Sequence, residues 1–147
     1  MRILVATVVV AALGTAARAD DNDKALKAFA GQIVMSPDAP PSRFDDLPSY
    51  VKSNATKDGH YELIKWDINF VGVLAKTADK VVLVVADPTA KQDKELISIE
   101  LPVKRLVVIG HFTPTKAASF AAGKPYDVTL LAGKAVVAKA VLVLHSS

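Results

Sequence analysis

The feature that most constrains the fold is an alternating stretch from Glu62 to Phe70. Every second residue from Ile64 to Phe70 is apolar, and the residues between them are polar. Trp66 is one of these apolar residues. A strict period of two predicts a strand with one apolar face and one polar face. The stretch also carries the single tryptophan of the chain. Because burying so large a side chain contributes strongly to a core, we expect Trp66 to be buried at the centre of a β-sheet protein.

The first 19 residues have the composition of a secretory leader. Arg2 is followed by an apolar run over residues 3–13, and the segment ends in Ala17-Arg18-Ala19. A basic start, a short apolar run and small residues before the cleavage point are typical of a signal peptide, and the run is too short to cross a bilayer. We predict a signal peptide over residues 1–19, export to the periplasm or the extracellular space, and no transmembrane segment after cleavage. Residues 20–147 then form one domain.

Composition narrows the class of protein further. Cysteine is absent, so an exported domain must hold together by packing, which favours a bacterial periplasm or cell surface over a small disulfide-rich module. Lys and Arg number 18 and Asp and Glu 15, and because two of the basic residues lie in the leader, the remainder is nearly neutral. No cluster of basic residues forms a footprint for nucleic acid or lipid headgroups. The sequence therefore predicts no nucleic-acid partner.

Turn signals divide the chain into about seven short strands. Besides the Trp66 strand, the predicted strands cover residues 29–35, 81–86, 97–101, 106–112, 126–131 and 135–144. Gly72 interrupts the alternation and predicts a bulge or bend. Ala132-Gly133-Lys134 predicts a tight hairpin between the last two strands. Short strands with turns between them predict a mainly-β, antiparallel sandwich of two sheets.

One short helix is predicted between the first two strands, within residues 44–54. The prolines between residues 37 and 41 end the first strand, because they remove ladder donors. Asp45 or Asp46 is suited to cap the helix, and Pro48 is suited to its first turn.

The segment from Phe120 to Val128 resembles the corner before the penultimate strand of fibronectin type III and immunoglobulin-like domains. Gly123 makes a turn and Tyr126 opens the next strand, and in such domains the tyrosine hydroxyl bonds back to upstream backbone. Trp66 resembles the core tryptophan of the same pattern. The resemblance implies an immunoglobulin-like β-sandwich with a binding or structural role, and it supplies no catalytic residue.

No motif predicts a catalytic, cofactor or metal site. His60, His111 and His145 are the three imidazoles, and no two of them have the spacing of a ligand pair, although Asp58 or Glu62 is available to join them. No serine lies in a nucleophile motif, and the glycines form no phosphate-binding loop. The sequence therefore predicts a protein that is not an enzyme. Two alternatives remain: a periplasmic metal-binding protein, and a small hydrolase whose active site no sequence motif identifies.

A surplus of apolar residues is the one feature that points to a function. Residues 81–86, 106–109 and much of 136–144 are apolar at both parities, whereas a sheet with one face in water normally alternates. In the last strand Lys139 marks the outward parity, so Val137, Val141 and Val143 are predicted to face away from the core.

Two readings of this outward face remain open. The helix or the connectors cover it, or it binds a protein partner or a second copy of the chain. The sequence as a whole favours a non-enzymatic extracytoplasmic interaction or structural module of the cell envelope.

Overall fold

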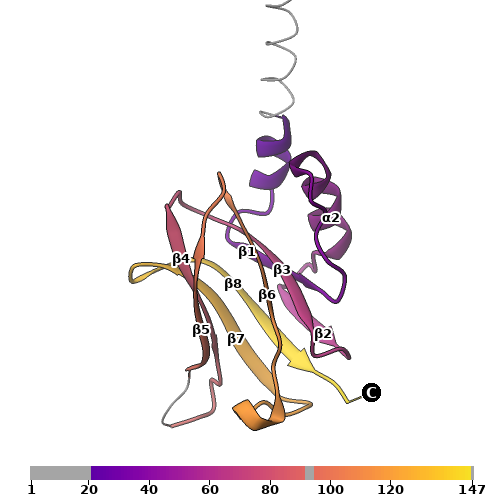
Figure 1. Cartoon of the computed structure of the whole chain (residues 1–147), viewed down its shortest axis with the longest axis vertical. Helices are drawn as coiled ribbons and strands as arrows, with labels where there is room; N and C mark the ends of the chain where they lie inside the picture. The colour runs from indigo at the N-terminus through magenta and orange to yellow at the C-terminus, as the bar shows by residue number, and fades with distance from the viewer. Residues whose placement is uncertain (1–20, 92–94, 147) are drawn as a thin grey trace, which may run out of the picture.

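The computed structural model describes residues 21–91 and 95–146, and it is mainly β (Figure 1). Its strands are β1 (Gln32–Ser36), β2 (His60–Leu63), β3 (Ile68–Val73), β4 (Lys80–Ala86), β5 (Glu95–Pro102), β6 (Val107–Phe112), β7 (Pro125–Ala132) and β8 (Ala135–Leu144). They form one eight-stranded sheet in the order β5-β4-β7-β8-β1-β3-β6, with β2 added to β8. The sheet curls until it is nearly barrel-shaped.

The strand directions correct one part of the predicted fold. Both β1 and β2 run parallel to β8, whereas the remaining pairs of the sheet are antiparallel. The mainly-β class is confirmed, but the expected purely antiparallel arrangement of seven strands is wrong. A single mixed sheet of eight strands takes its place, because the helical excursion after β1 lets β2 return in the same direction as β1.

The predicted helix between the first two strands is confirmed. The 3-10 turn η1 (Phe44–Asp46) leads directly into α2 (Leu47–Asn54), and Pro48 lies in the first turn of α2. Asp46 is the N-cap residue of α2, one of the two residues predicted, but its side chain makes no capping hydrogen bond. Asp45 instead accepts a hydrogen bond of 2.7 Å from the Asn22 amide. Because η1 runs into α2, its own backbone carbonyl of Phe44 accepts the N–H of Leu47.

Buried apolar side chains form two clusters on opposite sides of the sheet. The larger one fills the barrel interior and includes Phe70, Tyr126 and Leu142. The second lies on the outer side of β1, β3 and β6, under α2 and the helical residues 21–27; its buried members are Leu26, Val34, Leu47, Val51, Val71, Val73 and Val107. The helices therefore cover one half of the outer surface, which explains why strands in that half are apolar at both parities.

The alternating stretch around Trp66 is not one strand. It divides into β2 and β3, and residues 64–67 lie in neither. β2 ends beside Leu144, where β8 also ends, and the chain then crosses to pair with β1 and β6 as β3. The predicted full burial of Trp66 is wrong, since its side chain is half-buried and packs at the edge of the main cluster.

Gly72 also has a different role from the predicted one. β3 passes through Gly72 in regular register with both neighbouring strands, so there is no bulge there. A Cβ atom at this position would lie 2.3 Å from Cδ1 of Leu130. Gly72 therefore permits a close approach across the barrel interior, whereas the register shift within the last hairpin lies between Leu130 and Leu131.

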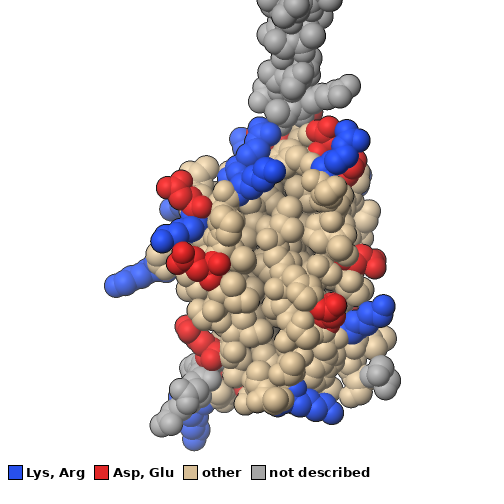
Figure 2. All heavy atoms as spheres, in the orientation of Figure 1, with Lys and Arg blue, Asp and Glu red and all other residues tan. Residues whose placement is uncertain are grey.

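Charged side chains are dispersed. On the face shown in Figure 2, acidic and basic side chains lie mainly around the margin, and neither sign forms a large patch.

Candidate functional site

A groove on the outer side of the sheet, where β1 and β2 share the edge of β8, is the candidate site. It has a volume of about 630 Å³. We call it the β8 groove; its lining residues are Gly31, Gln32, Lys57, Asp58, Gly59, His60, Asp127, Thr129, Lys139, Ala140 and Val141. It lies outside the half of the sheet that the helices cover, because no residue of β7 or β8 belongs to the second buried cluster.

β1 and β2 begin at neighbouring positions along the same edge of β8, and we call this place the fork. Two glycines shape the backbone there. Gly31 precedes β1 and Gly59 precedes β2, and both have positive φ angles, 86° and 71°. The carbonyl of Gly31 accepts the N–H of Lys139 at 3.1 Å, and the carbonyl of Gly59 accepts the N–H of Val141 at 2.8 Å. Lys139 and Val141 are neighbouring positions on the same edge of β8. β2 therefore begins to pair with β8 close to the point where the pairing of β1 with β8 ends. The left-handed backbone at each glycine makes these two entries possible.

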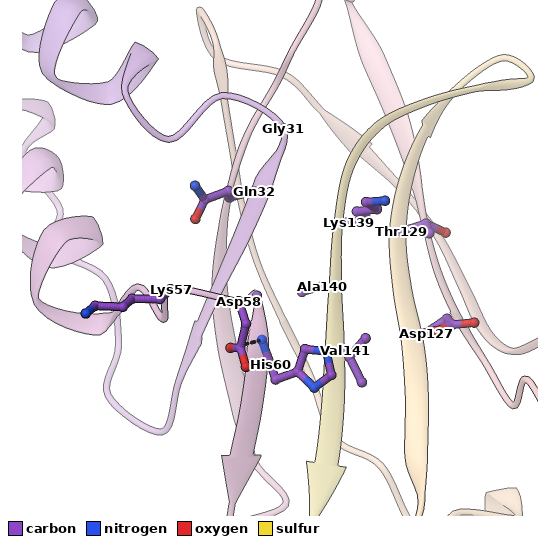
Figure 3. A pocket seen from close by; sticks show the side chains of 11 residues that line it. Gly31, Gln32, Lys57, Asp58, His60, Asp127, Thr129, Lys139, Ala140 and Val141 are labelled. Carbon is purple, nitrogen blue, oxygen red and sulfur yellow. Dashed lines mark hydrogen bonds between the residues drawn. The ribbon is translucent and has the colours of Figure 1, made fainter.

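Polar side chains surround an apolar floor in the groove (Figure 3). Thr129 pairs across the sheet with Lys139, and Asp127 pairs with Val141, which is also opposite His60. Figure 3 shows the imidazole of His60 beside Val141, and Lys139 and Thr129 at paired positions of β8 and β7. The groove thus presents both charge signs around Val141.

The groove charges differ in how they are held. Asp58 accepts the N–H of His60 at 3.1 Å, and backbone hydrogen bonds, chiefly this one, lower the pKa of Asp58. Within residues 21–91 and 95–146, no ion pair involves Lys57, Lys139 or Asp127. These three groups are therefore available to a ligand that carries charges of both signs.

The three valines predicted to face outward do not share one face. Val137 is only 2% exposed and belongs to the main core cluster. The register shift in the last hairpin adds a residue there, which turns Val137 inward and leaves Val136 55% exposed. Val141 and Val143 keep the outward parity and are half-buried. Of the three, Val141 lines the β8 groove; whether Val141 and Val143 bind a partner stays a prediction.

The histidines lie in three separate places. His60 lines the β8 groove. His111 pairs with Asp67, whose carboxylate also accepts a hydrogen bond from Thr113 at 3.2 Å. His145 lies 3.1 Å from a carboxylate oxygen of Glu62. In the part of the chain that the structure describes, no three His, Cys, Asp or Glu side chains are grouped as metal ligands. The metal-binding and hydrolase alternatives stay predictions that these contacts do not test.

Tyr126 makes the contact that the resemblance implied. Its hydroxyl accepts the N–H of Ala121 at 2.7 Å, and its ring lies 4.8 Å from the ring of Phe120. Tyr126 is fully buried, so this bond closes the loop before β7 against the core.

The sequence pointed to Val141 and Lys139 but not to the polar wall around them. No sequence pattern linked His60 to Val141, because only the parallel pairing of β2 with β8 brings the two residues side by side. Asp127 had no partner in sequence that would single it out. Gly59 within the turn before β2 was the one local signal of the fork.

No protein-family model matches the chain, and no curated protein matches it. Among the described residues, no helix has both the length and the hydropathy needed to span a bilayer. The chain is a mainly-β protein with a mixed, nearly closed sheet.

Proposed function

We propose that the protein is a non-enzymatic extracytoplasmic interaction module of the cell envelope, and that the β8 groove binds an extended segment of a protein partner. One observation carries this proposal: charges of both signs surround an apolar floor in a groove on the half of the sheet that the helices leave uncovered.

The lining favours a polypeptide over other classes of ligand. A polyanion would require a surface of one sign, whereas Lys139 and Asp127 offer one charge of each sign on neighbouring strands. A segment with alternating polar and apolar residues can place an apolar side chain on Val141 and its charges on the walls. The mixed lining resembles ordinary protein interfaces, which combine an apolar centre with a polar rim.

The extracytoplasmic location rests on the predicted leader, which lies outside the described residues. Cleavage after Ala19 would make Asp20 the first residue of the exported protein. Intact-mass measurement of the protein recovered from its host decides this point. A mass that retains residues 1–19 would move the proposal to another compartment.

Site-specific crosslinking tests the binding function. A photoreactive amino acid at His60, which is exposed and lines the β8 groove, is expected to trap a protein partner in the host envelope. The same amino acid at Ile109, which is 44% exposed on β6, is the matched control outside the groove. The partner captured at position 60 should be identified by mass spectrometry and should be lost in Lys139→Glu but retained in Lys134→Glu, a change in the exposed hairpin.

A second test separates binding from folding. Val141→Thr with Val143→Lys changes the outward parity of β8, and because both side chains are half-buried we expect a loss of about 1 kcal/mol or less in the free energy of unfolding, together with loss of partner capture. Retained capture in a folded double variant would contradict the groove as the binding site. Unfolding of the variant would show instead that the two valines serve the core.

A further inference from the structure

A second depression lies at the break between β2 and β3, at the opposite end of β2 from the fork. Its volume is about 330 Å³, and it is lined by Ile64, Trp66, Lys116, His145 and Ser146. We propose that it binds the ring of an acidic saccharide, a pyranose that carries a carboxylate. The proposal concerns different residues from the β8 groove and does not depend on the function proposed for that groove.

The floor of the depression is apolar and accessible. Ile64 is 62% exposed, more than Val136 at 55% or Ile109 at 44%. Trp66 is half-buried, and its indole N–H donates to the carbonyl of His145 at 3.2 Å. Because that bond occupies its one donor, Trp66 can contribute to a ligand only through its ring. Stacking against a ring is the interaction that remains available to it.

The rim of the depression is polar and carries one cation without an ion pair. The imidazole of His145 is paired with the carboxylate of Glu62. Lys116 is exposed on the 3-10 turn η2 (Lys116–Ala118) and takes part in none of the ion pairs formed by the described residues. Thr115 caps this turn by accepting the N–H of Ala118 at 3.1 Å, which holds Lys116 beside the depression. A single ammonium group suits a ligand with one carboxylate.

The shallow shape decides between a saccharide and a purely apolar ligand. Pockets for apolar ligands usually bury most of the ligand surface. A flat aliphatic or aromatic molecule on Trp66 and Ile64 would leave its far side in water. A pyranose has C–H groups that can stack on the indole and hydroxyl groups around its rim that remain hydrated or bond to Ser146. A pyranose therefore loses less binding free energy than a purely apolar ligand when the protein covers only one of its sides.

Trp66 provides a direct assay, since it is the one tryptophan of the chain. Titration of the protein with sodium D-glucuronate is expected to change its emission saturably, with a dissociation constant of about 1 mM for a ligand of this size. D-Glucose, which lacks the carboxylate, should bind about tenfold more weakly, because one ionic hydrogen bond is lost. Sodium acetate should leave the emission unchanged, because it has no ring to stack.

Matched variants test the two parts of the depression. Lys116→Gln should weaken glucuronate binding about tenfold, whereas Lys134→Gln, in the exposed hairpin, should not. Ile64→Ser should weaken binding and Val136→Ser should not, and ligand-observed NMR gives a readout independent of the indole. Both apolar positions are exposed, at 62% and 55%, so the variants are expected to fold. The proposal is overturned if glucuronate gives no response up to about 50 mM, if acetate gives the same response, or if Lys116→Gln binds like the wild-type protein.

Discussion

The amino group of Lys124, just before β7, pairs with the carboxylate of Asp87, just after β4. Asp87 is only 7% exposed, and its other oxygen accepts the backbone N–H of Thr89 at 2.9 Å and the Thr89 hydroxyl at 2.7 Å. The pair therefore ties the turn after β4 to the start of β7, next to the edge where those two strands are hydrogen-bonded.

This contact predicts a defined acid limb of stability. The bond from Lys124, followed by the bonds from Thr89, lowers the pKa of Asp87 from 3.8 to about 2. Because the ionised form is favoured in the folded chain, its contribution to the free energy of unfolding is complete above about pH 4 and is lost as the pH falls toward 2. Urea unfolding measured at a series of pH values should show this loss. The same loss should be smaller in Lys124→Met, with Lys134→Met as the control that keeps it.

Tyr126→Phe is predicted to destabilise the fold by about 0.5–1.5 kcal/mol, because it removes the partly buried hydrogen bond that the N–H of Ala121 donates to the Tyr126 hydroxyl. Tyr50→Phe is the matched control. The Tyr50 hydroxyl donates to the carbonyl of Asp38 at 2.8 Å, but in an exposed position, so water can replace it. Equal losses of unfolding free energy in the two variants would show that the bond to Ala121 contributes little.

Gly72→Ala is predicted to cost about 1–3 kcal/mol, since its new methyl group would overlap Leu130. Leu130→Ala alone should also destabilise the protein, because it empties a fully buried core position. The combined variant should lose less than the sum of the two changes, as the smaller side chain leaves room for the methyl group. Strictly additive free energies of unfolding would mean that the two positions do not meet.

Adjacent substitutions test the register shift in the last hairpin. Val137→Thr places a hydroxyl in the core and is predicted to cost about 1–3 kcal/mol, whereas Val136→Thr, at a position 55% exposed, should change stability by less than about 0.5 kcal/mol. Thermal or urea unfolding of the two variants gives the comparison. If Val136→Thr were the costly change, the hairpin would have the unshifted register.

Much of the fold could be predicted from local patterns. The strands corresponding to β4, β6, β7 and β8, and the helix before β2, follow from short apolar runs, turn residues and proline positions. Each of these signals acts over a few neighbouring residues, so the sequence alone expresses it. Tyr126 and its loop contact were also predictable, because the hydroxyl reaches backbone only five residues upstream.

The failures share a physical cause. Apolar and polar residues still alternate through residues 64–67, although no strand continues there. Alternation shows which face of a sheet a side chain occupies, but it does not show which strand is the hydrogen-bonding partner. Val137 was assigned outward for the same reason: one added residue in the hairpin reverses parity beyond it. The β8 groove depends on β1 and β2 lying beside the same strand, and no local pattern specifies a parallel partner that far along the chain.

The shared edge of β8 has a consequence for the order in which the chain folds. β2 pairs with no strand except β8 within the described sheet, so residues 60–63 have no ladder to join until residues 141–144 have emerged from the ribosome or crossed a membrane. Contacts between such distant segments carry a large loop-closure entropy and slow folding. The depression around Trp66 needs both β2 and His145, so we expect it to be completed only at the end of folding. The fluorescence of Trp66 should then report the last and slowest phase of refolding.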